Sequence, residues 1–416
     1  MINRSAGLAL LAAAATACAA TVSGTQVSSA DAAGSMIDAS ALDLPTHDAS
    51  EAAVGDSPPG EDTPRPLDRL AIGVGIGRLV RRDGQVILWG EQAELFDGVP
   101  SSAIDGLPRE ALGRGTDRSL VGLWSYCYIA RSVSGGLFCW GRNDLGQLGN
   151  GSTSPSVEPV AVIGVGSVTE VVSSGLAWCV LSDGSVRCWG HFSLGHGEPG
   201  SSPVPISIPA PIVRIFGGTN AGHFLGLDAN GSLWCWGNNL SSACGVGPPV
   251  IYPNAVRVPP VPTVRSVAIE EGYSCVLSTD GNVRCWGWVP AGLTGGWDGG
   301  EPRTLLTPTI APAYAGATAI SAGFGFLCAI QPTGRVVCGG SPTFQLTLGY
   351  RPRGPSPFPP HEVPGVENVI ELRTAANHSC ALTSSDDVYC WGFDMPRQLG
   401  IVNQYSHSPP RRLIYP

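Results

Sequence analysis

The stretch Ser274-Cys-Val-Leu-Ser-Thr-Asp-Gly-Asn-Val-Arg-Cys-Trp-Gly287 decides the fold, because close relatives of it recur about every 50 residues along the chain. It predicts a β-hairpin, since Asp280-Gly281 supplies a turn in which Gly tolerates a positive φ, and β-branched and aromatic residues fill both arms. Counting outward from the turn places Cys275 opposite Cys285. Opposed strand residues lie at the separation that a disulfide needs, so the two thiols are expected to bond.

The remaining cysteines of the repeats can be paired in the same way. The counting predicts four more disulfides, Cys127–Cys139, Cys179–Cys188, Cys328–Cys338 and Cys380–Cys390. In the fourth unit Leu225 stands at the first position, and Cys235 is left with Cys244, which aligns with Leu148 of the second unit; we therefore predict a bond between these two cysteines. In the first unit Leu79 and Leu88 replace both cysteines.

A metal site is the alternative use of paired cysteines. Structural zinc sites usually contain closely spaced Cys-x2-Cys pairs, and the chain has none. Twelve cysteines fall in the repeats and pair evenly, which favours disulfides in an exported chain. We expect no metal ligands and no cofactor.

The period of the repeat predicts the architecture. A Trp-Gly marker ends each hairpin at Trp89, Trp140, Trp189, Trp236, Trp286 and Trp391, with Gly339-Gly340 in the sixth unit. Four strand-like runs per unit at this period are typical of a propeller. The prediction is an all-β fold, a seven-bladed β-propeller of four-stranded antiparallel blades over residues 67–416, with hairpins near 79–90, 127–141, 179–190, 225–237, 275–287, 328–340 and 380–392.

The ring of blades must also close. In this interpretation each unit begins with a Pro-x-x-Val strand, such as Pro159 to Val162 in the third unit and Val256 to Val258 in the fifth. The first unit lacks a good one. Because Pro410 to Tyr415 has that composition, we predict that the C-terminal strand pairs in the first blade and closes the ring.

The N-terminus has the pattern of an export signal. A short basic start, an apolar run and small residues predict a signal peptide over residues 1–17. Ala15-Thr-Ala-Cys18 resembles a bacterial lipobox, so Cys18 is the expected lipid attachment site, with plain cleavage and secretion as the alternative. Residues 18–66 then comprise the anchor cysteine and an acidic spacer that is too poor in apolar residues to fold.

Composition excludes several kinds of chemistry. The chain has no Lys, which removes P-loop and Schiff-base lysines. The formal charge of −9 predicts no nucleic-acid partner. His191 and His196 share a loop without a third metal ligand and are expected to be solvated. The Asp-Gly pairs recur at the same turn and are hairpin residues, so no catalytic residues are predicted.

Two stretches carry a family resemblance. Gly141-Arg-Asn-Asp-Leu-Gly-Gln-Leu-Gly-Asn-Gly151, and Asn377 to Thr383 followed by Val388 to Gly392, resemble the repeats of the regulator of chromosome condensation family. The resemblance implies a seven-bladed propeller. The Cys-bearing hairpin is similar to repeats in exported bacterial proteins of this superfamily, which also includes a secreted β-lactamase inhibitory protein that acts by binding.

The resemblance implies a binding protein. We expect an exported, non-enzymatic protein-binding scaffold of the cell envelope that binds through rim loops and is a monomer. The expected location is the outer membrane or cell surface by lipid anchor only, otherwise the periplasm or the medium. The candidate contacts are Trp124, Trp288 and Trp297. Alternatives are a structural envelope component and a carbohydrate-active or peptide-hydrolysing enzyme; nucleotide exchange on a cytosolic GTPase is not expected.

Overall fold

The computed structural model describes the repeat region of the chain, with gaps. The described residues are 69–73, 76–82, 85–90, 109–110, 119–121, 125–129, 136–191, 200–294, 302–340, 345–350, 358–393, 399–400 and 406–415. Residues 65–416 form one compact unit. The expected signal peptide, Cys18 and the acidic spacer lie outside the described residues.

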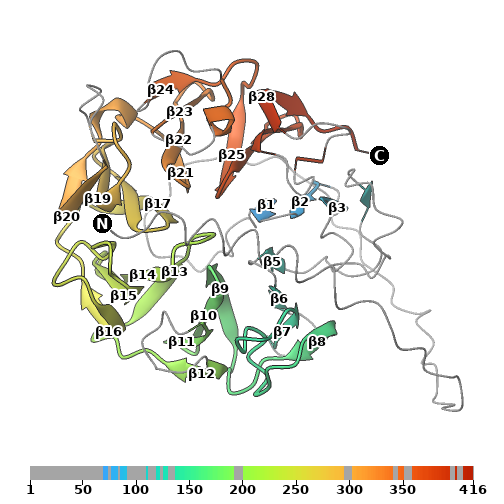
Figure 1. Cartoon of the computed structure of the whole chain (residues 1–416), viewed down its shortest axis with the longest axis vertical. Helices are drawn as coiled ribbons and strands as arrows, with labels where there is room; N and C mark the ends of the chain where they lie inside the picture. Colours follow the sequence, from blue (N-terminus) through green and yellow to red (C-terminus); the bar gives the residue numbers. More distant parts are fainter. Residues whose placement is uncertain are drawn as a thin grey trace, which may run out of the picture. The chain divides into compact units, whose positions relative to one another are not determined.

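The described strands form seven four-stranded antiparallel sheets, and each sheet takes its strands in chain order. Figure 1 shows the first strand of each sheet (β1, β5, β9, β13, β17, β21, β25) toward the centre and later strands successively farther out. The fold is therefore an all-β propeller with four-stranded antiparallel blades.

The strands are short. The first three sheets comprise β1 (Leu70–Gly73), β2 (Ile76–Val80), β3 (Val86–Trp89), β4 (Arg109–Glu110); β5 (Ser119–Val121), β6 (Ser125–Ile129), β7 (Leu137–Gly141), β8 (Ser156–Ala161); β9 (Val168–Ser174), β10 (Ala177–Ser182), β11 (Ser185–Gly190), β12 (Gly200–Pro205). The next two comprise β13 (Ile212–Phe216), β14 (His223–Asp228), β15 (Leu233–Asn238), β16 (Ile251–Arg257); β17 (Val264–Glu270), β18 (Tyr273–Ser278), β19 (Val283–Val289), β20 (Arg303–Ile310). The last two comprise β21 (Ala319–Gly323), β22 (Phe326–Ile330), β23 (Val336–Gly340), β24 (Phe358–Glu362); β25 (Val369–Ala375), β26 (His378–Thr383), β27 (Val388–Phe393), β28 (Ser406–Arg412). Two 3-10 helices, η4 (Pro312–Tyr314) and η5 (Gln345–Leu348), lie between strands.

The Trp-Gly marker is a β-bulge. In the third sheet the register toward the outer strand shifts between Cys188 and Gly190, so that Trp189 between them has no partner there. The glycine after the marker position has a positive φ, between 93° and 135°, in all seven described sheets. A Cβ at Gly190 would lie 2.4 Å from the backbone oxygen of Leu176. The marker therefore records a backbone requirement that only Gly meets.

The outer strands carry prolines at the same bulge. In six sheets the extra residues of the outer strand include a proline, namely Pro159, Pro203, Pro253, Pro308, Pro360 and Pro410. Proline cannot donate to a neighbouring strand, so it is tolerated at an edge and blunts that edge against pairing with other chains. The Pro-x-x-Val pattern is thus the signature of an outer edge strand.

The position of this strand corrects two predictions. The strand that contains Pro159 is β8 and completes the second sheet, and β16, with Val256, completes the fourth, so each such strand belongs with the hairpin before it. The prediction that the C-terminal strand completes the first blade is wrong, because β28 pairs with β27 in the last sheet. The physical reason is the chain path, in which every sheet begins at its central strand and ends at its edge.

A third correction concerns the hairpin of the first sheet. Leu79 pairs with Ile87, and Leu88 pairs with Arg78, so Leu79 and Leu88 do not replace an opposed cysteine pair. The register places Arg78, which is buried, at the first cysteine position. The prediction went wrong by one residue because no cysteine marks the register in this turn.

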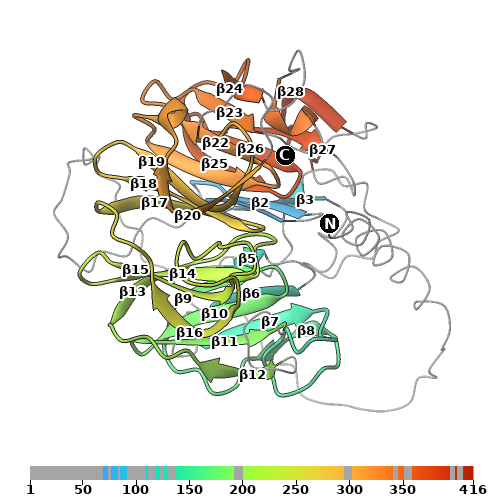
Figure 2. The same ribbon diagram turned by 60° about the vertical axis from the view of Figure 1, so that its left-hand side comes forward.

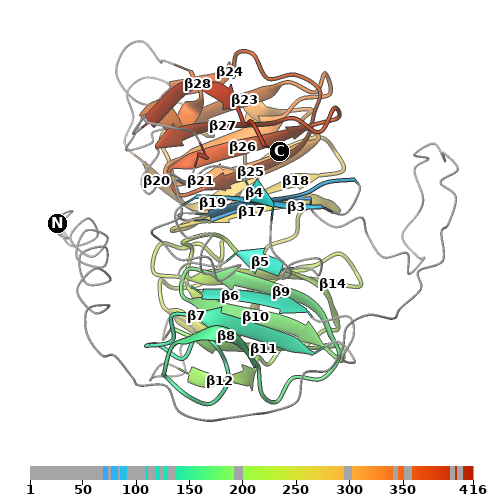
Figure 3. The same ribbon diagram turned by 90° about the vertical axis from the view of Figure 1, so that its right-hand side faces the viewer.

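The first and last sheets contact each other. The backbone N–H groups of Arg69 and Leu70 donate to the two carboxylate oxygens of Glu371 at 3.0 Å each, and Arg69 pairs with Asp386 at 2.9 Å. Leu70 and Trp89 share one buried cluster with residues of the last sheet. Figures 2 and 3 show β3 beside the last sheet. Side chains, and no shared strand, join these two sheets.

The marker tryptophans pack against the sheet before them. A Cβ at Gly149, Gly245, Gly349 or Gly400 would lie 2.7 to 2.9 Å from the indole of Trp189, Trp286, Trp391 or Trp89 respectively, and all four glycines have a positive φ. The residue before each of these glycines is fully buried: Leu148, Cys244, Leu348 and Leu399. The contact recurs between the last sheet and the first, so the same packing joins these sheets as joins sheets that follow one another along the chain.

Candidate functional site

All twelve cysteines of the repeats are bonded in the structure, in the six pairs that the sequence predicts. Five pairs join opposed residues of the two middle strands of a sheet, with Cα atoms 4.0 to 4.2 Å apart. All twelve are buried. Six disulfides fit a protein of an oxidising compartment.

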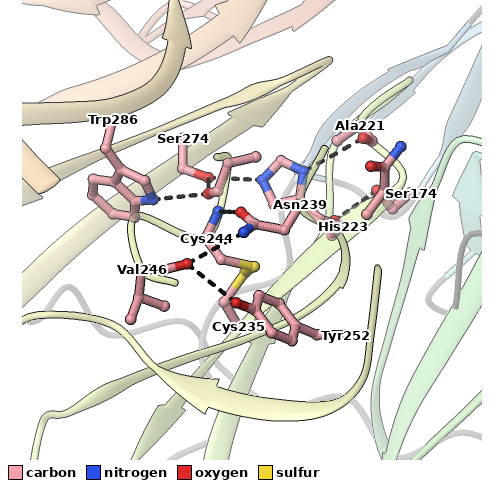
Figure 4. Close-up of a disulfide and its surroundings, with 12 residues drawn as sticks. Ser174, Ala221, His223, Cys235, Asn239, Cys244, Val246, Tyr252, Ser274 and Trp286 are labelled. Atoms are coloured by element: carbon pink, nitrogen blue, oxygen red, sulfur yellow. Dashed lines mark hydrogen bonds between the residues drawn. A yellow bond between two sulfur atoms is a disulfide. The ribbon is translucent and has the colours of Figure 1, made fainter. Parts of the chain in front are cut away.

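The Cys235–Cys244 disulfide joins a strand to the loop that follows it, with the Cα atoms 5.4 Å apart. Asn239 organises this loop, as Figure 4 shows. Its Oδ1 accepts the Cys244 N–H at 2.8 Å, and its Nδ2 donates to the oxygens of Val246 (3.2 Å) and Pro248 (2.8 Å). The loop is therefore fixed twice, by a covalent bond and by a buried amide.

A similar asparagine holds the loop of the second sheet without a disulfide. Asn143 Oδ1 accepts the Leu148 N–H at 2.8 Å, and its Nδ2 donates to the oxygens of Ser152 and Ser154. The alignment of Cys244 with Leu148 is confirmed, since each follows its asparagine by five residues and each is fully buried.

A buried hydrogen-bond chain joins the third, fourth and fifth sheets behind this loop (Figure 4). Ser174 Oγ donates to the backbone oxygen of His223 at 2.8 Å, and His223 Nε2 lies 2.7 Å from Ser274 Oγ. Ser274 Oγ donates to the Ala243 oxygen at 3.0 Å, so it must accept its other hydrogen bond from His223 Nε2–H. Burial lowers the pKa of His223 to about 4, which keeps this imidazole neutral. The chain ties sheets together and is closed to solvent.

Above this junction lies an exposed surface that we call the rim patch, formed by Leu240, Ser241, Glu271, Gly272 and Trp288. Trp288 is 41% exposed and Leu240 is 60% exposed. A Cβ at Gly272 would lie 3.1 Å from Ser241 Cβ and 3.6 Å from Trp288 Cβ, so residues of the fourth and fifth sheets meet here. Trp288 N–H donates to the Gly272 oxygen at 2.7 Å.

Two adjacent carboxyl groups end β17 at this place. Glu270 is fully buried, and neither of its carboxylate oxygens has a hydrogen-bond partner among the described residues. Burial raises the pKa of Glu270 to about 8, with the nearby backbone N–H groups of Glu271 and Asn220 acting in the opposite direction. Glu271 is exposed, yet partial desolvation still raises its pKa, and its Oε2 accepts Asn220 Nδ2–H at 3.2 Å.

Of the three tryptophans named as candidate contacts, only Trp288 can be placed; Trp124 and Trp297 lie outside the described residues. The sequence did not single out Glu270, Glu271 or His223. A signal for Trp288 was present, because the residue two positions after the marker is Arg142, His191 or Asn238 in three other sheets. An aromatic residue at an otherwise polar position indicates a specific use.

No metal centre is found in the described part of the chain, where no group of three His, Cys, Asp or Glu side chains could hold an ion. His191 is half-buried, which lowers its pKa, and His196 lies outside the described residues. The described ranges also contain no helix long and apolar enough to cross a bilayer.

The class that these observations define is a disulfide-closed β-propeller. Models of the regulator of chromosome condensation (RCC1) repeat match residues 134–177 and 376–394. The chain belongs to the RCC1 repeat propeller family, and the resemblance proposed from its sequence is confirmed.

Curated relatives are similar over part of their length. The ultraviolet-B receptor UVR8 of Arabidopsis thaliana is 24% identical over 303 residues, 68% of this chain and 67% of that protein. The human RCC1-like G exchanging factor-like protein is 30% identical over 184 residues, 39% of this chain and 39% of that protein, so the match spans well under half of it.

Solved structures share the fold. Prp20p of Saccharomyces cerevisiae has a TM-score of 0.66 at 17% identity, covering 83% of this chain and 88% of that one. Human WBSCR16 has a TM-score of 0.63 at 19% identity, covering 74% of this chain and 85% of that one. Likeness at this identity shows the fold alone.

Proposed function

We propose that this protein is an exported, non-enzymatic scaffold that binds a protein partner through loops at one rim of the propeller, with its seven sheets forming one closed ring. In the proposal lipidated Cys18 holds it at the cell envelope, and the acidic spacer sets it off from the membrane. The observation that carries the proposal is the rim patch, where exposed Trp288 and Leu240 come from two different sheets. Exposed aromatic anchors on a rigid frame are typical of binding surfaces.

Three further observations support the proposal. The six buried disulfides and the interlocking loops keep the frame rigid, so that little ordering entropy is lost when a partner docks. The printed descriptions of two related structures name protein partners, Gsp1p and histones in one and Kap60 in the other. The described residues show no catalytic constellation that would favour an enzyme.

The test is affinity capture from an envelope extract with the full tagged chain, read by mass spectrometry. We expect a stoichiometric partner that is retained at high salt and lost after the propeller is reduced and unfolded. Saturable turnover of an oligosaccharide or peptide library by the purified chain would contradict the proposal, and capture of nothing would favour a structural envelope component. Labelled palmitate should enter the chain and be lost in Cys18→Ser; incorporation that persists would remove the anchor.

A further inference from the structure

The rim patch has a definite composition, and the inference drawn from it rests on the proposed binding function. Its apolar part is Trp288 and Leu240, and its charged part is the exposed carboxylate of Glu271. Trp is among the residues that dominate binding energy when they become buried against a partner. The patch therefore offers an anchor and a charge side by side.

The negative charge of the patch is not balanced within the described residues. Their ion pairs include none to Glu270 or Glu271. Beneath Glu271, both oxygens of buried Glu270 lack a hydrogen-bond partner among the described residues. A cation brought to this place would meet two carboxyl groups that no described arginine neutralises.

The surface is also held in place. Leu240 and Ser241 follow Asn239, whose amide fixes the loop, and Cys244 bonds this loop to β15. Leu240 N–H donates to Asn238 Oδ1 at 2.9 Å, and Asn220 holds Glu271 from the fourth sheet. A partner meets a preformed surface, which lowers the cost of docking.

We propose that the rim patch binds a protein segment in which an Arg or Lys side chain stands next to an apolar side chain. The apolar group packs between Trp288 and Leu240, and the cation pairs with Glu271. The indole face of Trp288 adds a cation–π contact that an acidic or neutral segment does not make.

The test uses the full chain and an array of short peptides in which Arg or Lys stands next to Leu, Phe or Trp, with matched peptides that carry Gln or Glu in the basic position. We expect binding to the basic-apolar set. For the strongest peptide, measured by fluorescence polarisation, Trp288→Ala and Glu271→Gln should each weaken binding about tenfold or more. Leu306→Ala is the control, because Leu306 is 63% exposed on the outer strand of the same sheet and lies outside the patch.

Each other result overturns the inference, and three of them leave the proposed function standing. Peptide binding that Trp288→Ala leaves unchanged would move the site elsewhere. Preference for the Gln or Glu peptides would remove the cation. A concentration-dependent dimer abolished by Trp288→Ala would make a second copy the occupant. Failure to bind any peptide, together with a partner captured from the extract whose binding ignores both substitutions, would overturn the rim patch alone. Thermal unfolding of each variant checks that the fold is intact.

Discussion

The glycine that follows each marker tryptophan is a test of the bulge at the scale of one residue. Gly190 has a φ of 99°, and a Cβ there would meet the backbone oxygen of Leu176. Gly184 has a φ of 71° with nothing within 4 Å of a Cβ. We expect Gly184→Ala to cost about 1–2 kcal/mol from φ alone, and Gly190→Ala about 3–5 kcal/mol because backbone must also move. Chemical denaturation measures both; equal losses would mean that the close contact relaxes freely.

The buried carboxyl of Glu270 makes a prediction about pH. Its pKa is about 8 in the folded chain and near the ordinary value when unfolded, so the folded state binds the extra proton between these values. Stability that is present at pH 5 is therefore lost as the pH rises through 8, by up to about 1.4 kcal/mol per pH unit. Denaturant midpoints at pH 5, 7 and 9 should fall in the wild type and fall less in Glu270→Gln. Exposed Glu367→Gln is the control; a parallel decline in all three proteins would show that Glu270 is not the cause.

At the scale of one element, the loop of the fourth sheet has a covalent bond where other sheets have only a leucine. Cys244 stands where Leu148, Leu348 and Leu399 are buried. Replacing Cys235 and Cys244 by Ala removes a short loop closure worth about 2.5–3 kcal/mol and leaves a cavity. We expect Cys235→Ala with Cys244→Leu to recover part of that loss, since Leu fills the site. Non-reducing denaturation compares the two double variants, and a Leu variant no more stable than the Ala variant would mean that Cys244 is not equivalent to these leucines.

At the scale of the whole molecule, the junction between the first and last sheets uses a device that occurs elsewhere. Glu170 lies opposite Leu181 and Glu371 opposite Leu382, the same register position in two sheets. Glu170 accepts Ile215 N–H at 2.8 Å and pairs with Arg214, as Glu371 accepts the N–H groups of Arg69 and Leu70. Both carboxylates bridge one central strand to the central strand of the next sheet.

Glu371→Gln should therefore destabilise the propeller by about 1–3 kcal/mol, the range for hydrogen bonds to a charged acceptor. Hydrogen exchange should speed up in β1 and β25. Glu170→Gln, the matched control, should do the same in β9 and β13 and leave β1 protected. Because the sites are far apart in the chain and share no partner, the two losses should add. Unchanged exchange in β1 would show that this carboxylate does not hold the first sheet to the last.

The sequence by itself determined the repeat, the all-β class and the disulfides, because these depend on pairing within one hairpin. Cys275 and Cys285 are ten residues apart, and alternation along two arms of a turn brings them together without help from the rest of the chain. Even Cys244 could be assigned, by elimination within its own sheet. Only the tertiary structure decided how sheets are delimited, since β8 and β28 read equally well with the hairpin before or after them. It alone set Glu371 beside Leu70, and Trp288 beside Ser241 and Glu271. The physical reason is that these contacts join different sheets, where no local period or turn fixes which side chains meet.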